Sequence, residues 1–305
     1  MGLISAFLPR RDQAPWFSAR RAVVLALAAD VLALALIAGL FRAQEPVFGT
    51  ATSVAPLPEL EVQSRARLAL LRTEVGVVAE AGPSRMGIAL LTSEHGLLAD
   101  HDANEPFVLA SVSKVYILTA YLDLIAQGGR RPTETDMALM QDMIQWSDND
   151  SASTLWTRLG GPEGLADFLR SRGLDPIWPV EEDAAWGTLA ASPRQVADLL
   201  WNLMLGQLLD PESTQIAVAF LSKVDDEQRW GVSAGLNEPA STAFLKNGWY
   251  PEPEGWRLNS AGLVVMPEAE YVLVVLSDSS PTMEEGIERI EQVSRLINGY
   301  MASTR

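Results

Sequence analysis

A serine and a lysine three residues apart could together carry out nucleophilic catalysis. Ser111 and Lys114 lie in the run LASVSKVYIL, residues 109–118, whose apolar residues indicate a helix. A serine hydroxyl is a poor nucleophile until a base takes its proton, and a spacing of three places both side chains on one helical face. Lys114 could be that base if burial and nearby cations lower its pKa. A solvated surface lysine is the alternative interpretation.

Other catalytic groups are scarce in this chain. Its two histidines, His95 and His101, both fall in an expected N-terminal hairpin, which disfavours a Ser-His-Asp triad. The chain has no cysteine, so disulfides and thiolate metal sites are excluded, and two histidines alone make a poor zinc site. We expect neither a metal nor a cofactor.

Two triplets complete a larger pattern with Ser111 and Lys114. They are SDN at residues 147–149 and KNG at residues 246–248. In this order the three motifs resemble those of the penicillin-recognising serine hydrolases, specifically the class A β-lactamase and D,D-peptidase fold. The resemblance covers roughly residues 60–303.

The resemblance implies a role for each motif residue. Ser111 would be the nucleophile and Lys114 its base, with Ser147 relaying a proton to the leaving nitrogen. Asn149 would hold the substrate amide. Lys246, expected at a strand end, would meet the substrate carboxylate.

The resemblance also implies an oxyanion hole, formed by the backbone N–H groups of Ser111 and Trp249. Gly248 belongs to the same substrate-binding motif, and Asp148 is expected to be structural. Asn247 departs from the family pattern, because Thr or Ser usually occupies this position and contacts the substrate carboxylate. An amide donor would have to replace that hydroxyl.

A second departure concerns deacylation. Class A β-lactamases carry a glutamate that activates the deacylating water in a loop that corresponds here to residues 173–193, and this loop is several residues shorter. Glu181 or Glu182 is the candidate base, although a solvated acidic run is the other interpretation. The shorter loop favours slow deacylation.

Four further side chains are weaker candidates. Arg257 or Arg229 could add a positive contact for the substrate carboxylate. Trp249 and Tyr250 could line the cleft, although packing in the core would explain them equally well.

The pattern of apolar residues predicts how these residues are positioned. Helices alternate with turns in the middle of the chain, and strand-like runs lie near both ends of the globular part, so one sheet should draw on both ends. We expect an α/β (α+β) fold with an antiparallel sheet flanked by helices, an all-helical subdomain, and one N-terminal transmembrane helix. The expected strands are 86–92, 96–101, 241–246, 256–265 and 271–278; the expected helices include 59–81 and those begun by Pro132-Thr133, Gly161-Pro162 and Ser192-Pro193.

An apolar run near the start predicts a membrane span. Residues 22–41 contain one charge, Asp30, and a helix of this length crosses a bilayer core of about 30 Å. Four arginines and one aspartate precede it, so residues 1–21 should be cytoplasmic. The composition of residues 42–58 indicates a linker. Residues 59–305 should form the hydrolase domain, on the extracytoplasmic side of a single-pass membrane protein. A cleaved signal peptide is the alternative.

The net charge of the chain disfavours one class of binding partner. The formal net charge is −16, and without residues 1–21 there remain 19 basic and 38 acidic residues. Binding to nucleic acid requires a basic face, so we expect no nucleic-acid partner.

These features predict a membrane-anchored serine hydrolase that is acylated at Ser111 by a β-lactam or a D-Ala-D-Ala-type peptidoglycan stem peptide. Such an enzyme would act in antibiotic response or on the cell wall, and the motifs do not separate the two. The alternative is a catalytically idle wall-binding or sensor module with a retained cleft, motivated by Asn247 and Asp30.

The predicted topology can be tested with reporter fusions. A phosphatase that folds only outside the cytoplasm, fused after Arg305, should be active, and a cytoplasmic reporter at the same place should not. The opposite pair of results would contradict the predicted location and a cell-wall substrate with it.

Overall fold

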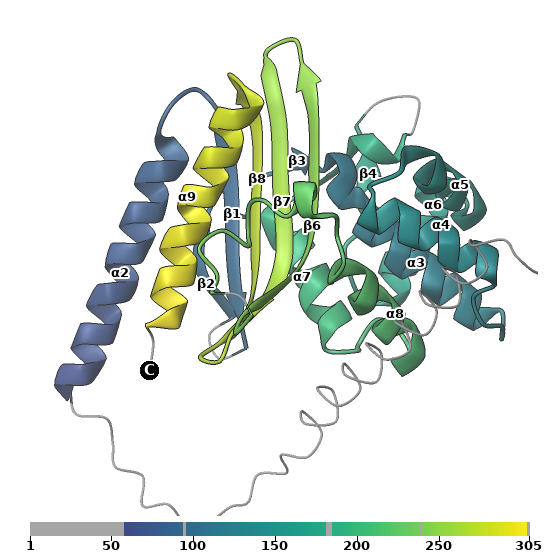
Figure 1. Ribbon diagram of the computed structural model, residues 1–305, viewed down its shortest axis with the longest axis horizontal. Helices are drawn as coiled ribbons and strands as arrows, with labels where there is room; N and C mark the ends of the chain where they lie inside the picture. Colours follow the sequence, from purple (N-terminus) through teal and green to yellow (C-terminus); the bar gives the residue numbers. More distant parts are fainter. Residues whose placement is uncertain (1–57, 94–95, 181–184, 238, 304–305) are drawn as a thin grey trace, which may run out of the picture. The chain divides into compact units, whose positions relative to one another are not determined.

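The computed structural model describes residues 58–93, 96–180, 185–237 and 239–303 (Figure 1). The predicted membrane helix at 22–41 lies outside these residues, as do the segments 1–21 and 42–57. Within the described part, no helix combines the length and the hydropathy that a bilayer crossing requires.

One antiparallel sheet of five strands is the centre of the fold. Its strands are, in spatial order, β2 (Gly96–His101), β1 (Arg85–Thr92), β8 (Glu270–Ser280), β7 (Gly255–Val265) and β6 (Thr242–Glu252). β8 therefore pairs with β1 on one side and with β7 on the other. Strands from both ends of the globular part thus form a single sheet, as the sequence predicts.

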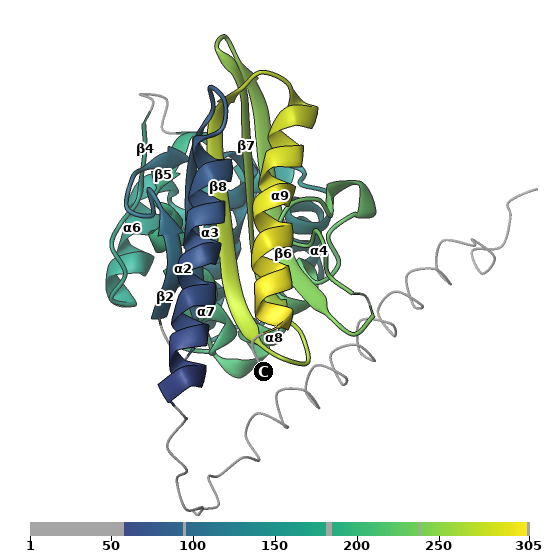
Figure 2. The ribbon, with the colours of Figure 1, turned by 90° about the vertical axis from the view of Figure 1, so that its left-hand side faces the viewer.

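Helices cover both faces of this sheet. α2 (Pro58–Glu80) and α9 (Met283–Ala302) lie side by side on one face (Figures 1 and 2). α7 (Pro193–Met204) packs on the other face, against β1, β7 and β8. Because both faces are covered, the middle strands read as nearly continuous apolar runs rather than as an alternation.

A group of helices lies beside the β6 edge of the sheet (Figure 1). Its members are α3 (Ser113–Gln127), α4 (Glu134–Gln145), α5 (Asn149–Leu159), α6 (Gly161–Ser171) and α8 (Pro211–Leu221). α4 begins at a capping box in which the side chains of Thr133 and Asp136 each accept a hydrogen bond from the other's backbone N–H. The helix starts predicted at Pro132-Thr133 and Ser192-Pro193 are confirmed.

Short elements connect the helices to the sheet. They are the 3-10 helices η1 (Ala110–Val112), η2 (Trp186–Thr188) and η3 (Asp226–Gln228), and the strands β3 (Phe107–Val108), β4 (Trp178–Pro179) and β5 (Leu189–Ala191). The three strands form a small antiparallel sheet in the order β3-β5-β4.

The structure corrects one expected boundary near the site. The sequence predicts a strand that ends at Lys246, but β6 continues to Glu252, so Lys246 lies in the middle of it. Gly248 and Pro251 read as strand breakers, yet β6 is an edge strand, where proline is tolerated because one row of N–H groups needs no partner strand.

A buried carboxylate holds the helical group together. Asp136 on α4 accepts hydrogen bonds from Tyr121 on α3 at 2.7 Å and from Arg158 on α5 at 3.1 Å. Arg130 contributes an ion pair at 2.7 Å. Burial alone would raise the pKa of Asp136, but the hydrogen bonds from Tyr121, Thr133 and Arg130 outweigh it and lower that pKa well below its usual range.

Replacing Asp136 with Asn should therefore destabilise the protein in a pH-dependent way. At pH 7 we expect a loss of about 2 kcal/mol in the free energy of unfolding, the scale of hydrogen bonds to a charged group. A carboxylate with a lowered folded pKa stabilises above its unfolded pKa of about 4, and this contribution is lost as pH falls towards the folded pKa. Urea titrations at pH 7 and pH 3 should show the difference from wild type shrinking at pH 3; a constant difference would contradict this account.

Candidate active site

Ser111 lies in η1, directly before α3 and its Lys114. Ala110 adopts a φ of 47°, a left-handed conformation that is strained for a residue with a side chain. The N–H of Leu109 donates to the carbonyl of Leu189 at 2.8 Å, which fixes the segment before the serine. Ala110 and Val112 are buried, whereas Ser111 between them is half-buried.

The edge of β6 comes unusually close to Ser111. A β-carbon placed on Gly248 would lie 2.6 Å from the backbone nitrogen of Ser111 and 2.8 Å from the carbonyl oxygen of Leu109. Real β-carbons do not make such contacts, so only glycine allows this approach. The backbones of Ser111 and the KNG triplet are thereby brought together.

Ser147 lies in the turn between α4 and α5, and it also has a left-handed backbone, with φ of 56°. Asp148 caps α5 by accepting a hydrogen bond from the N–H of Ser151 at 2.7 Å, the structural role expected for it. Bonds from Ser151 lower the pKa of Asp148, which keeps this residue ionised near Lys114. The capping bond thus holds the strained turn at the start of α5.

Two buried lysines converge on the hydroxyl of Ser147. Lys114 Nζ lies 3.1 Å from Ser147 Oγ and donates to the carbonyl of Ser147 at 2.6 Å. Lys246 Nζ approaches the same hydroxyl from β6, at 3.0 Å. Both lysines are fully buried. The three predicted motifs therefore meet at one point.

The burial of these lysines changes their protonation. Desolvation lowers the pKa of Lys114 to about 7, even though the charge of Asp148 acts to raise it. Desolvation, and then the charge of Lys114, lower the pKa of Lys246 well below its usual value. Near neutral pH Lys114 can thus exist as a free amine, the form that a general base requires.

Asn149 and Trp186 complete the surroundings of Lys114. Asn149 Oδ1 accepts a hydrogen bond from Lys114 Nζ at 2.8 Å, while the residue itself is exposed, so its amide N–H₂ can face a bound molecule. The Trp186 ring of η2 lies 4.7 Å from Lys114 Nζ and donates through Nε1 to Ser153.

The side chain of Asn247 makes its hydrogen bonds within the protein. Its side chain is fully buried, and its amide donates to the backbone carbonyls of Gln228 at 2.7 Å and Trp230 at 2.9 Å. Both amide hydrogens are thus used within the protein and none is left for a substrate carboxylate. Asn247 thereby connects the end of η3 and the residues directly after it, 228–230, to β6.

Trp249 and Trp230 form an aromatic corner next to the site. Their ring centroids are 6.0 Å apart at an interplanar angle of 62°, an edge-to-face contact between two half-buried side chains. Arg257, a weak candidate for substrate binding, forms an ion pair with Glu252 at 2.6 Å and lies over the Tyr250 ring.

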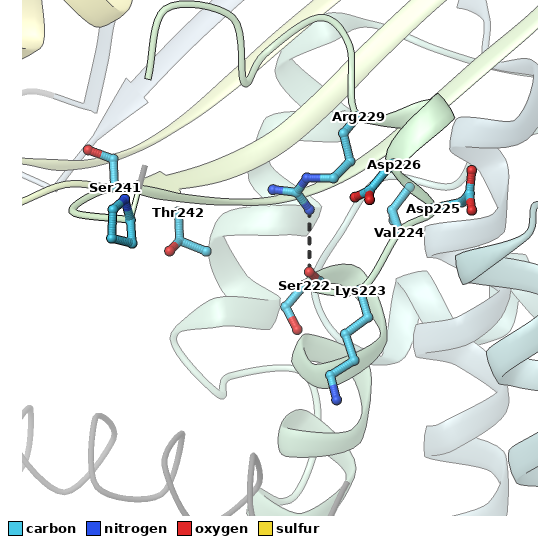
Figure 3. A pocket seen from close by; sticks show the side chains of 9 residues that line it. Ser222, Lys223, Val224, Asp225, Asp226, Arg229, Ser241 and Thr242 are labelled. Carbon is cyan, nitrogen blue, oxygen red and sulfur yellow. Dashed lines mark hydrogen bonds between the residues drawn. The ribbon is translucent and has the colours of Figure 1, made fainter. Parts of the chain in front are cut away.

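Arg229 points to a different cavity. Its guanidinium donates to the carbonyl of Ser222 and helps to line a polar cavity of about 510 Å³ at the start of β6 (Figure 3). Thr242, also in its wall, lies six residues before Gly248, or about 20 Å along an extended strand. This cavity is therefore separate from the site around Ser111.

The two candidates for the deacylation base, Glu181 and Glu182, lie outside the described residues. Among the residues that the structure describes, no three His, Cys, Asp or Glu side chains gather to hold a metal ion.

Three residues that contact the motifs are not predicted from the sequence: Trp186, Trp230 and Gln228. Trp186 falls in the loop 173–193 that was singled out for deacylation, and this was the only signal for it. Trp230 and Gln228 precede a turn-rich stretch with no periodicity, so their contacts with Asn247 follow only from the path of the chain in three dimensions.

A family model and a curated relative match this chain. The model described as "Beta-lactamase enzyme family" matches residues 137–301, just over half of the chain, which include Ser147 and Lys246 and begin after Lys114. A putative lipoprotein, LppW of Mycobacterium tuberculosis, is 28% identical over 206 residues. That alignment covers 65% of this chain and 65% of the lipoprotein's own length.

Solved structures share the fold. A representative class A β-lactamase from Bacteroides cellulosilyticus superposes with a TM-score of 0.70 at 17% identity, over 78% of this chain and 99% of the other. A mutant of PBP-A, in an acyl-enzyme complex with penicillin G, superposes with a TM-score of 0.64 at 23% identity, over 77% of this chain and 96% of the other.

The protonation of Lys114 gives a testable pH profile. If Lys114 is the base, acylation of Ser111 by benzylpenicillin should rise about tenfold per pH unit below pH 7 and level off above it, because only the free amine accepts a proton. Lys114→Arg cannot lose its charge near pH 7, and it should slow acylation by at least about a hundredfold.

Stopped-flow acylation between pH 5.5 and 8.5 would measure both effects. A flat profile, or a near-normal rate in Lys114→Arg, would assign the base to another group, with Ser147 the next candidate.

Proposed function

We propose that this chain, which belongs to the beta-lactamase enzyme family, is a serine hydrolase in which β-lactams or D-Ala-D-Ala-type stem peptides acylate Ser111. The convergence of Lys114 and Lys246 on the Ser147 hydroxyl, next to Ser111, supports this proposal most directly. Burial of two lysines costs desolvation free energy, and an idle binding module would gain no activity in return.

The proposed reaction begins with proton removal by Lys114. Ser111 Oγ bonds to the substrate carbonyl carbon as its proton passes to Lys114, and a tetrahedral intermediate forms. The C–N bond then breaks, and the leaving nitrogen takes a proton from Ser147, which is resupplied from the lysine. The product is an ester between Ser111 and the acyl group.

The oxyanion of this intermediate would be held by backbone donors. The N–H groups of Ser111 and Trp249 are the proposed pair, and the close approach at Gly248 supports it because it brings the two backbones together. Ser111 also precedes α3, whose N-terminal dipole favours negative charge.

Release of the acyl group requires a second base. Water must be deprotonated beside the ester, and Glu181 or Glu182 is the proposed group. Their loop is shorter than in class A β-lactamases, so we propose slow deacylation, which favours a peptidase over an efficient lactamase.

We further propose that residues 22–41 tether the enzyme outside the cytoplasm. LppW is described as a lipoprotein, which is consistent with a site at a membrane. A lipid attached through a cysteine sulfur would find no acceptor in this sequence, which contains no cysteine. The apolar helix is therefore the anchor that we propose.

Acylation without fast turnover is the expected kinetic signature. A fluorescent penicillin should label the protein stoichiometrically, with a burst followed by slow release over minutes, and Ser111→Ala should abolish the label.

Replacing both Glu181 and Glu182 with Gln should leave the burst intact and change the slow phase less than about tenfold, or about 1.4 kcal/mol of barrier. Fast steady-state hydrolysis of a chromogenic cephalosporin, abolished by either single replacement, would contradict slow deacylation and identify an efficient β-lactamase.

A further inference from the structure

The side-chain amide of Asn247 is not available to bind a substrate carboxylate. Asn247 lies between Lys246 and Gly248 on β6, at the position where the family pattern has Thr or Ser. Its amide instead donates to Gln228 at 2.7 Å and to Trp230 at 2.9 Å, and the side chain is 0% exposed. A substrate cannot bind this amide unless the hydrogen bonds that hold residues 228–230 in place are broken.

The two hydrogen bonds also position an aromatic pair, Trp230 and Trp249, beside the site. They fix the backbone on both sides of Arg229, and with it the ring of Trp230 against the ring of Trp249. The surface that the hydrogen bonds of Asn247 hold in place is therefore aromatic. Such a surface contacts apolar or aromatic groups well and offers little to a carboxylate.

Three cations of this region have partners within the described part of the protein. Lys246 is 0% exposed and donates to both Ser147 Oγ and the carbonyl of Asn247. Arg257 is paired with Glu252 at 2.6 Å, with 11% of its side chain exposed. Arg229 donates to Ser222 in the wall of the separate cavity in Figure 3.

The exposed charges on the neighbouring rim are negative. η3 lies against the end of α4, because the N–H of Asp225 donates to the carbonyl of Gln145 at 3.0 Å. Asp226 and Glu227 on η3 are exposed, and so is Asp150 at the start of α5. The field of these carboxylates disfavours an anionic group at this end of the site.

We propose that, within the acyl-transfer function proposed above, the preferred substrates are uncharged at the position that meets the Asn247 end of the site. Such substrates are carboxamides, esters or chain-extended peptides, with an apolar or aromatic group against Trp230 and Trp249. Asn247 acts here as a positioning residue, because it works through Trp230 and does not touch the substrate.

A matched pair of compounds tests this preference on the unmodified protein. Benzylpenicillin and its methyl ester differ only in the carboxylate, and each acylation rate, measured by stopped flow and intact mass, is divided by that compound's rate of ring opening by hydroxide. We expect the two corrected rates to agree within about threefold, or the ester to be faster, because no hydrogen bond to the carboxylate is lost.

Three outcomes separate this inference from the proposed function. A preference of more than about tenfold for the acid would overturn the inference and leave the acyl-enzyme function intact, since a site that binds a carboxylate discriminates by at least that much. Acylation by neither compound would overturn both. Comparable acylation by both supports both.

Variants test the positioning role of Asn247. Asn247→Thr removes both amide donors to Gln228 and Trp230 and puts a hydroxyl in their place, so the ratio of acid to ester rates should rise at least about fivefold. Asn237→Thr makes the same replacement at an exposed position and should leave the ratio unchanged. A folded Asn247→Thr with the wild-type ratio would overturn the positioning role.

Discussion

Two buried lysines that share one hydroxyl impose the main constraint on this site. Lys114 Nζ and Lys246 Nζ lie 3.1 and 3.0 Å from Ser147 Oγ, so the two nitrogens are at most about 6 Å apart. Two full charges at that separation would repel each other by about 3 kcal/mol even at an effective dielectric constant of 20. The site is therefore stable with one lysine neutral, and the fold thereby supplies a free amine that can act as a base.

The surrounding elements keep this arrangement in place. A left-handed backbone at Ser147 turns its hydroxyl and its carbonyl towards Lys114, and the capping bond of Asp148 holds that turn at the start of α5. Lys246 comes from the middle of β6, where strand pairing on one side and Asn247 on the other leave it little freedom. Strain at Ala110 and Ser147 is tolerated because each lies beside a firmly bonded helix.

The sequence predicts elements better than it predicts contacts. Capping residues such as Thr133 and Ser192 act over three or four residues, so the helix starts could be located without tertiary information. The three motifs were also placed correctly relative to one another, since Lys114, Ser147 and Lys246 do meet. The use of the Asn247 amide could not be predicted, because an amide can donate equally well to a substrate or to a distant carbonyl. The length of β6 was underestimated because Gly248 and Pro251 signal a turn unless the strand is known to lie at an edge.

The order of the strands in the sheet has a genetic consequence. β6 pairs only with β7, and a hairpin of two strands is marginally stable in water, so β6 depends on β8 to hold β7. β8 in turn pairs with β1, which places Arg85 against Asp278, 193 residues later in the chain. A premature stop codon just before Glu270 would leave every motif residue encoded and still remove the strand that the site is built on. A nonsense allele that falls before β8 should therefore abolish function as completely as a change in the motifs themselves.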